Sequence, residues 1–324
     1  MKAIIPVAGV GSRLRPHTYT LPKVLLNVAG KPIIGHILDK IIEEGFNEAV
    51  IVVGYLGDMI EEYLTKHYDI KFTFIEQEER LGLGHAIWIT REHIGTEPML
   101  IILGDTIFEV ELKDVLRREY SSLGVKAVDD PRRFGVAEMK NGFISKLIEK
   151  PEQPTSNLAV VGLYYIKRPQ LLVECLNREI SENIRTKGEF QLTDALQMMI
   201  DSGEKFSTFP VEGWYDCGKP ETLLSTNQKL LKSKSKHKEI FGCVINPPVY
   251  IADDADIHNS IIGPYATIAS RAVVRDSVVQ NSIIGEETKV LSMLLNESII
   301  GNNAFVKGKA RRVNIGDSSE VDLS

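Results

Sequence analysis

The chain has 324 residues, of which 43% are hydrophobic and 25% are charged, and its formal net charge is −6 at pH 7. This length favours a large core with a smaller appended domain, and the composition is that of an ordinary globular protein. The negative charge argues against a nucleic-acid partner, because binding a phosphate backbone requires a basic face. No apolar run reaches membrane-spanning length, no signal-peptide pattern precedes the first strand, and the three cysteines are widely spaced. We therefore expect a cytoplasmic protein with reduced thiols and no membrane partner.

The N-terminal segment predicts a buried strand followed by a phosphate-binding loop. Residues 3–7 are apolar, Gly9 and Gly11 allow a tight turn against a ligand, and Arg13 and Lys23 add positive charge to the same loop. Bare backbone amides and cations together suit a polyphosphate. The loop is not a P-loop, because no Gly-Lys-Ser/Thr run follows Gly9 at the required spacing. It is not a dinucleotide fingerprint either, because that motif needs a further glycine three residues after Gly11.

The next segments alternate between predicted helices and strands. An apolar stripe at helical spacing predicts a helix that begins at Pro32 and ends at Gly45. We then expect, in chain order, a strand over 49–53, a helix over 58–64, a strand over 70–75, a helix over 85–93 and a strand over 99–103. Such alternation of elements predicts an α/β fold with a doubly wound, mostly parallel sheet. Ligands bind beyond the carboxyl ends of the strands in such sheets, where the glycine loop and Gly104-Asp105 fall.

The C-terminal part of the chain carries a short repeat. An Ile-Gly pair begins at residues 262, 284, 300 and 315, and an aliphatic residue follows each isoleucine six positions later. This period predicts a parallel β-helix built from hexapeptides, with three strand-like edges per coil and its aliphatic residues stacked into one column. Lysines and serines alternate over residues 232–238, which favours a solvated linker. We therefore expect an α/β domain at residues 1–231, a linker at 232–244 and a β-helix at 245–324.

The order of these motifs resembles that of one enzyme family, the sugar-1-phosphate nucleotidylyltransferases. The resemblance is carried by Ala8-Gly9-Val10-Gly11-Ser12-Arg13-Leu14, Pro22-Lys23 and Gly30-Lys31-Pro32. It covers nearly the whole chain and is greatest to the glucose-1-phosphate thymidylyltransferases in their long form, which ends in a left-handed β-helix. It implies an enzyme that joins a nucleoside triphosphate to a sugar 1-phosphate and releases pyrophosphate. Ala8 stands where most of the family has glycine, as it does in several uridylyltransferases.

The reaction that the resemblance implies needs little acid–base chemistry from side chains. The attacking phosphate oxygen is already an anion at neutral pH, so the obstacles are repulsion between two anions and the entropy of aligning them. We therefore expect a direct in-line displacement without a covalent enzyme intermediate, helped by positioning and charge neutralisation.

The resemblance also implies three groups of site residues. Those for the nucleotide are Ala8, Gly9, Gly11, Ser12, Arg13, Gln77, Gly82 and Asp105. Those for the sugar phosphate are Gly135, Glu149, Lys150, Val161, Gly162 and Lys187. Catalysis is assigned to Arg13, Lys23 and Lys150, and the Mg²⁺ ion to the carboxylates of Asp105 and Asp216.

Within these groups, Gln77 and Gly82 match the pair that reads a pyrimidine. An amide offers a donor and an acceptor to the base edge, and glycine lets the base approach the backbone. Two positions depart from the family pattern: Thr106 follows Asp105 where the family has asparagine, and Lys187 replaces an arginine and so loses a planar two-pronged contact. His85 and His17 lack partners at ligand spacing, and we interpret both as structural or solvated.

Several functional alternatives remain open at this point. The Gln77-to-Gly82 spacing, Leu103-Gly104-Asp105 and the β-helix favour dTTP, whereas Gly82-Leu83-Gly84-His85-Ala86 is similar to uridylyltransferases and favours UTP. The two bases differ by one methyl group, which an apolar pocket discriminates by only about 1–3 kcal/mol. A non-catalytic regulatory subunit is disfavoured because the loop cations and both carboxylates are present. An acyltransferase is disfavoured because the repeats lack an identifiable catalytic histidine, so we expect the β-helix to be a self-associating or packing module. We also expect the protein to form a homo-oligomer.

Overall fold

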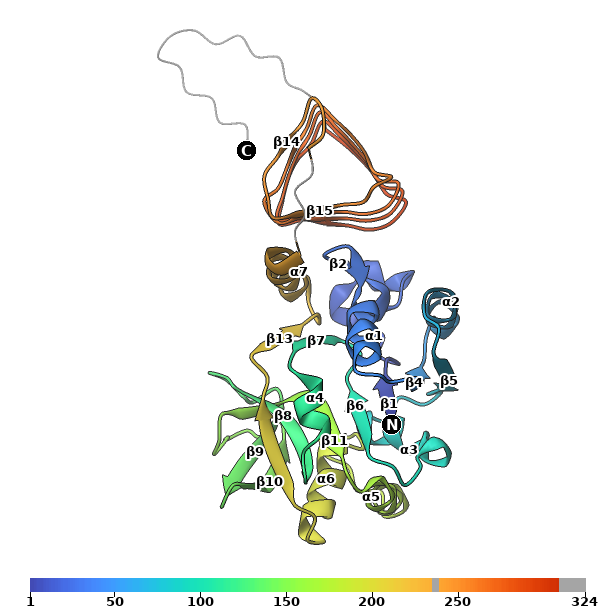
Figure 1. Ribbon diagram of the computed structural model, residues 1–324, viewed down its shortest axis with the longest axis vertical. Helices are drawn as coiled ribbons and strands as arrows, with labels where there is room; N and C mark the ends of the chain where they lie inside the picture. The colour runs from blue at the N-terminus through green and yellow to red at the C-terminus, as the bar shows by residue number, and fades with distance from the viewer. Residues whose placement is uncertain (235–238, 309–324) are drawn as a thin grey trace. The chain divides into compact units, whose positions relative to one another are not determined.

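The computed structural model describes residues 1–234 and 239–308, which divide into two compact units. The first unit contains residues 1–26 and 31–226, and the second contains residues 27–30 together with the described residues from Asn227 onward. In Figure 1 the first unit is drawn mainly in blue to yellow and the second mainly in orange to red. The domain boundaries expected at residues 231 and 245 stay predictions.

The described part of the first unit is built around a nine-stranded sheet (Figure 1). Four neighbouring strands are parallel, in the order β6 (Met99–Ile102), β1 (Lys2–Pro6), β4 (Glu48–Val53) and β5 (Lys71–Glu76). Beyond β6 the sheet continues through β11 (Leu158–Ile166), β8 (Ser121–Ala127) and β12 (Phe206–Pro210), of which β11 runs antiparallel to both of its long neighbours. A hairpin of β9 (Gly135–Lys140) and β10 (Phe143–Glu149) pairs beside the first residues of β11.

Helices cover both faces of this sheet. The helices of this unit are α1 (Ile33–Glu43), α2 (Gly57–His67), α3 (Leu83–Trp88), α4 (Leu112–Leu116), α5 (Pro169–Ser181) and α6 (Leu192–Asp201), and α7 (Pro220–Lys234) begins in this unit and ends in the second. On one face, Ile4, Val50 and Ile101 pack against apolar side chains of α3, α5 and α6. The α/β fold class with a doubly wound, mostly parallel sheet is confirmed. None of the helices in the described parts of the chain combines the length and apolar character that crossing a bilayer requires.

The helix expected over residues 85–93 is shorter than predicted and begins earlier. The α-helix ends at Trp88, and residues Arg91–His93 form a separate 3₁₀ turn. Thr90 explains the break, because its hydroxyl donates to the carbonyl of Ile87 over 2.7 Å, an alternative to continued helical bonding. The shortened helix places residues 82–86 at the edge of the sheet where the candidate site lies.

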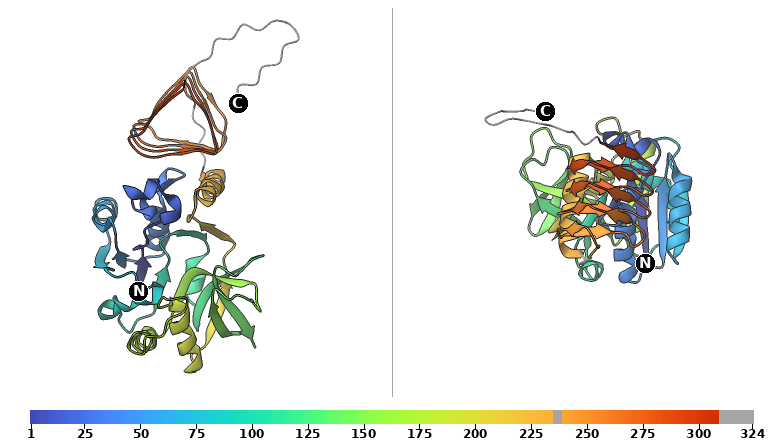
Figure 2. Two further views of the ribbon diagram at one scale, coloured as in Figure 1. Left: turned by 180° about the vertical axis from the view of Figure 1, so that it is seen from behind. Right: turned by 90° about the horizontal axis from the view of Figure 1, so that it is seen from above.

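Over residues 239–308 the second unit is a parallel β-helix with a triangular cross-section (Figure 2). One edge contains β14 (Val244–Ile245), β17 (Ile261–Ile262), β20 (Val278–Gln280) and β23 (Leu294–Asn296). The second contains β15 (Val249–Ile251), β18 (Ala266–Ile268), β21 (Ile283–Ile284) and β24 (Ile299–Ile300). The third contains β16 (Asp256–His258), β19 (Val273–Arg275), β22 (Lys289–Leu291) and β25 (Phe305–Lys307). The β-helix is therefore confirmed.

The expected single column of aliphatic residues is wrong in one respect. Ile284 pairs with Ile268 and Ile300 on the second edge, but Ile262 lies on the first edge and pairs with Val279. The six-residue spacing therefore links aliphatic residues on successive edges of one coil, and each edge has a column of its own. The fourth predicted repeat, near residue 315, lies outside the described residues.

Among the described residues, four further short strands lie outside the main sheet and the β-helix. β7 (Thr106–Glu109) and β13 (Gly213–Asp216) form an antiparallel ribbon outside the main sheet, and this ribbon positions part of the candidate site. β3 (Lys31–Pro32) leads directly into α1 of the first unit, and residues 27–30 of the second unit include β2 (Asn27–Val28).

Candidate active site

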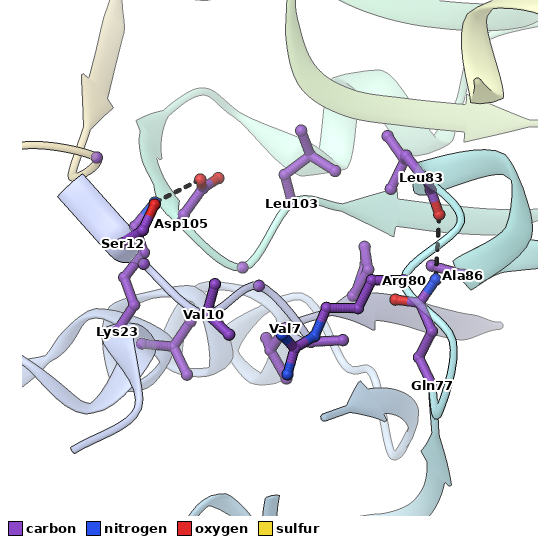
Figure 3. A pocket seen from close by; sticks show the side chains of 18 of the residues that line it. Val7, Val10, Ser12, Lys23, Gln77, Arg80, Leu83, Ala86, Leu103 and Asp105 are labelled. Carbon is purple, nitrogen blue, oxygen red and sulfur yellow. Dashed lines mark hydrogen bonds and ion pairs between the residues drawn. The ribbon is translucent and has the colours of Figure 1, made fainter. Parts of the chain in front are cut away.

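A cavity of about 460 Å³ lies beyond the carboxyl ends of β1, β5 and β6 (Figure 3). All of the residues expected to bind the nucleotide line it, together with one expected catalytic lysine: Ala8, Gly9, Gly11, Ser12, Arg13, Lys23, Gln77, Gly82 and Asp105. The order of strands explains this convergence, because β1 lies between β6 and β4, and the loops that follow parallel strands meet at one edge of the sheet.

One end of the cavity contains an ion pair that joins two distant segments. Lys23 Nζ donates to Asp105 Oδ2 over 2.6 Å (Figure 3). The side chain of Lys23 is 9% exposed and that of Asp105 is 40% exposed. A buried ammonium requires a charged or hydrogen-bonded partner, so Asp105 keeps Lys23 extended toward the cavity. Thr106, the departure from the family pattern, donates its hydroxyl to the other oxygen of Asp105 at 3.4 Å.

The ribbon of β7 and β13 places the backbone segments that carry the two expected metal carboxylates side by side, although Asp216 itself does not line the cavity. Thr106 pairs with Asp216, and the amide of Cys217 donates to the carbonyl of Asp105 over 3.2 Å. The residues described by the structure include no cluster of three or more acidic, histidine or cysteine side chains of metal-binding geometry. Two hard carboxylates nevertheless fit Mg²⁺, which is bound through one or two carboxylates with water and substrate phosphates as its other ligands.

Gly218 determines how closely two opposite charges approach at this end of the cavity. A Cβ atom on Gly218 would lie 2.8 Å from Asp216 Oδ1 and 2.9 Å from Arg13 Nη2. Any larger residue would therefore displace the guanidinium of Arg13 or the carboxylate of Asp216. The sequence analysis did not select Gly218 as a site residue. Its position two residues after Asp216 was the signal that could have identified it.

The other end of the cavity holds the predicted pyrimidine-reading pair. Gln77 is 7% exposed, and its Nε2 lies 3.1 Å from the carbonyl of Gly82 and 3.2 Å from Nδ1 of His85. Figure 3 shows the amide oxygen of Gln77 on the side away from this bond. His85, which we interpreted as structural or solvated, thus contacts a predicted site residue directly.

Gly82 is required for the backbone path of this segment. Its φ angle is 114°, and a Cβ atom would lie 2.3 Å from the carbonyl oxygen of Phe190. Backbone bonds of 2.8 Å from Phe190 N to Leu81 O and from Gly84 N to Phe190 O hold the two segments against each other. A side chain at this position would separate them.

Arg80 is a further residue that the sequence analysis missed. It lines the cavity, and Figure 3 shows its side chain extending into it. Among the residues that the structure describes, none forms an ion pair or a hydrogen bond with Arg80. A cation between Gln77 and Gly82 in the sequence was the signal that could have identified it.

The residues expected to bind the sugar phosphate form a second group near this cavity. Gly135 and Glu149 are paired at the ends of β9 and β10. Glu149 accepts a hydrogen bond of 2.7 Å from the hydroxyl of Thr193 and lies 3.2 Å from Lys150 Nζ. The sequence analysis did not assign this orienting role to Thr193. The only signal in the sequence was the mostly polar run Gln191-Leu192-Thr193-Asp194, in which Thr193 lies.

Val161 and Gly162 lie on β11, and Leu103 N donates to the carbonyl of Gly162 over 2.9 Å. Because Leu103 lines the nucleotide cavity, this bond joins the two groups. Lys187 pairs instead with Glu152 at 3.0 Å, with both side chains exposed. None of the six expected sugar-phosphate residues lines the cavity itself; Gly162 is joined to it through Leu103, and Lys187 forms a surface ion pair.

Burial shifts several pKa values around the site. It lowers the pKa of His85, an effect opposed by Glu79 and reinforced by Arg185, and so favours the neutral form of the ring. Burial also raises the pKa of the Tyr164 hydroxyl, and the nearby carboxylates of Glu149 and Asp105 raise it further. Tyr164 therefore stays protonated between the two groups of residues.

A buried acid borders the loop that contains Gly82 and His85. Glu179 on α5 is fully buried, and within the described parts of the chain neither of its carboxylate oxygens has a hydrogen-bond partner. Burial raises its pKa to about 8, with a further contribution from Asp194. Its Oε2 would lie 2.9 Å from a Cβ atom on Gly84, so it borders the same loop as Gly82 and His85.

Comparison with known proteins agrees with this geometry. A family described as nucleotidyl transferase matches residues 2–233. A low-salt glycan biosynthesis nucleotidyltransferase of Haloferax volcanii is 31% identical over the whole of both chains, and a glucose-1-phosphate thymidylyltransferase of Streptomyces griseus is 29% identical, also over the whole of both. A UDP-glucose pyrophosphorylase solved with UDP-glucose is 28% identical, with a TM-score of 0.62 over 72% of this chain and 99% of that one.

Proposed function

This chain belongs to the nucleotidyl transferase family, and we propose that it joins dTTP to glucose 1-phosphate with release of pyrophosphate. The observation that carries the proposal is the convergence of a glycine loop, the Lys23–Asp105 pair and the Gln77 amide on one cavity of about 460 Å³. This cavity combines a place for phosphates at one end with a place for a base at the other. The full-length similarity to a thymidylyltransferase supports the choice of dTTP.

The chemistry follows from the charges at the site. An oxygen of the sugar phosphate attacks the α-phosphorus, the new P–O bond forms, and the bond to the departing pyrophosphate breaks. Arg13 and Lys23 neutralise the triphosphate, while Lys150 and Glu149 hold the sugar phosphate. Correct alignment of the two anions supplies roughly 7–11 kcal/mol of the barrier reduction, so no side chain has to act as a nucleophile.

Enzymes of this family generally use a divalent metal, and we assign Mg²⁺ to the carboxylates of Asp105 and Asp216. Their adjacency through the β7–β13 ribbon supports this assignment. When bound, the ion neutralises phosphate charge as it develops. The chain's own contribution is to hold both carboxylates beside Lys23 and Arg13.

The orientation of the Gln77 amide supports a pyrimidine with an N–H at ring position 3. Its Nε2 is occupied by Gly82 O and His85 Nδ1, which leaves Oε1 as an acceptor. Thymine and uracil offer this hydrogen, whereas neutral cytosine presents an acceptor there. UTP is the second candidate, supported by the structural similarity to a UDP-glucose pyrophosphorylase.

For the second unit we propose self-association into a homo-oligomer. Val244, Ile261, Val278 and Leu294 stack in register on the outside of one edge of the β-helix. Val244 is 53% exposed and Leu294 is 82% exposed, and a second copy of the chain would cover them. Light scattering of the wild type and of Leu294→Lys tests this, because a monomeric wild type contradicts it.

We further propose a cytoplasmic protein without a nucleic-acid or membrane partner, consistent with the net charge of −6.

A substrate matrix tests the proposed reaction. Each of dTTP, UTP, CTP, GTP and ATP is combined with several sugar 1-phosphates and Mg²⁺, and both pyrophosphate and nucleotide sugar are measured. We expect the highest kcat/KM with dTTP and glucose 1-phosphate, and UTP within about 10–200-fold of dTTP, the range that one methyl group provides. Pyrophosphate release without a nucleotide sugar would support a non-transferring relative instead. Equal rates with CTP would contradict the assigned base.

A further inference from the structure

The amide of Gln77 is restrained through one of its two polar atoms. Nε2 contacts Gly82 O at 3.1 Å and His85 Nδ1 at 3.2 Å, which accounts for both of its hydrogens. Among the described residues, none donates to Oε1. The carbonyl of Gly82 can only accept, so the nitrogen of the amide must face it. His85 Nδ1 must then accept the second hydrogen, which places the proton of the neutral ring on Nε2.

The His85 ring is itself held in place. Its centroid lies 5.7 Å from that of Trp88 on the same helix, and Trp88 Nε1 donates to Asn177 on α5 over 2.9 Å. The charged groups that act on the ring are Glu79, in the segment before the helix, and Arg185, in the segment before α6. The ring therefore presents Nδ1 to Gln77 from a fixed direction.

Given the function proposed above, we infer that His85 is a positioning residue that selects the base by fixing the Gln77 amide with Oε1 toward the cavity. The selection works through hydrogen-bond direction. An oxygen facing the base accepts the N3 hydrogen of thymine or uracil and repels the lone pair on N3 of cytosine. If Nδ1 were absent or protonated, the second amide hydrogen would lose its acceptor, and only the bond to Gly82 O would still orient the amide, so Oε1 would be held less firmly toward the base.

Two variants separate this role from packing. His85→Leu keeps an apolar side chain but removes the acceptor, and His85→Asn keeps an acceptor oxygen near the position of Nδ1. kcat/KM is measured for dTTP, UTP and CTP at pH 8, with His93→Leu, at an exposed histidine of the neighbouring turn, as the matched control. The net contribution of one hydrogen bond corresponds to a change of about 2–13-fold in an equilibrium constant, here that between the two orientations of the Gln77 amide.

We expect the ratio of kcat/KM for dTTP to that for CTP to fall by about 10-fold in His85→Leu. His85→Asn should retain the ratio within about 3-fold, and His93→Leu should leave it unchanged. In the wild type the same ratio should fall as pH is lowered through the pKa of His85, which burial shifts below its usual value, whereas in His85→Asn it should stay level. The pH series needs only the wild type and the Asn variant, so it remains decisive if the Leu variant does not fold.

The outcomes distinguish this inference from the proposed function. A wild type that uses CTP as well as dTTP contradicts the proposed base specificity before any variant is compared. A wild type that prefers dTTP, with a ratio unchanged in His85→Leu and level across pH, would falsify the role of His85 alone. Equal losses in the Leu and Asn variants would also overturn it, because they would show that His85 acts by packing.

Discussion

The nucleotide end and the sugar-phosphate end of the site differ in how firmly the fold holds their cations. Lys23 is 9% exposed and is fixed on Asp105 at 2.6 Å, whereas Lys150 is 43% exposed and pairs with Glu149 at 3.2 Å. Exposed ion pairs contribute only about 0–1 kcal/mol, so they restrain a side chain weakly. The comparison indicates a preformed nucleotide cavity and a sugar-phosphate region whose cation is free to reorient onto an anion.

The largest effects should come from the metal carboxylates, which belong to the preformed end. Asp105→Asn and Asp216→Asn keep shape and hydrogen bonding but remove charge, and each should lower kcat by about 10²–10³-fold. Steady-state rates with Mg²⁺ check this, and thermal melts confirm folding. Asp114→Asn, at an exposed position on α4, should be neutral. Near-normal turnover in either variant would remove that residue from the metal site.

A comparison of two lysines sharpens the contrast directly. Lys23→Met should lower kcat by about 10²-fold, because it removes a preorganised charge next to the triphosphate. Lys150→Met should instead raise KM for the sugar phosphate by about 10–100-fold, the range for a lost hydrogen bond to a charged group, and leave KM for the nucleotide unchanged. Lys140→Met, exposed at the end of β9, is the control. Identical effects of the two substitutions on both substrates would contradict the division into two ends.

Substitution of Gly82 tests the rigidity of the segment between Gln77 and His85, to which we assign base recognition. Gly82→Ala places a Cβ atom against Phe190 O, so it should raise KM for the nucleotide by about 10-fold and cost about 1–3 kcal/mol of unfolding free energy. Kinetics and urea unfolding measure the two effects. Gly95→Ala, where nothing lies within 4 Å of the added atom, should change neither. An unaltered KM in Gly82→Ala would show that the segment moves aside easily.

The smallest effect concerns Glu179, the buried acid that borders the same segment. Its folded-state pKa of about 8 lies above the usual value of 4.5 for glutamate, so between these values the native state binds more protons than the unfolded state. Its contribution to stability is therefore complete below about pH 4.5 and is lost as pH rises through 8.

Glu179→Gln should remove this pH dependence and stabilise the protein at pH 8 by about 1–3 kcal/mol, the cost of an unsatisfied buried group. Melting temperatures from pH 5 to 8 measure it, with the exposed Glu174→Gln on the same helix as the control. If the melting temperature changed over this range by the same amount in the wild type and in both variants, Glu179 would be shown to have a partner in solution.

Much of the nucleotide cavity could be predicted because its residues are consecutive. Ala8 to Arg13 form one loop after one strand, and Gly104-Asp105 follows another, so hydrophobic period and glycine placement were enough to put them at the same edge. The early end of α3 was not predictable, because it depends on a hydroxyl of Thr90 that bonds backward to Ile87. The three-column stacking of the β-helix was missed because a six-residue period does not say which edge each aliphatic residue occupies.

The sequence by itself determined the elements, the class of fold and the kinds of charge at the site, because these depend on local periodicity and on which side chains follow each strand. Only the tertiary structure decided which groups act on one another. The β7–β13 ribbon places Asp216 beside Asp105 across more than a hundred residues, and the fold turns His85 Nδ1 toward Gln77. Such contacts depend on direction and burial, and residue spacing carries information on neither.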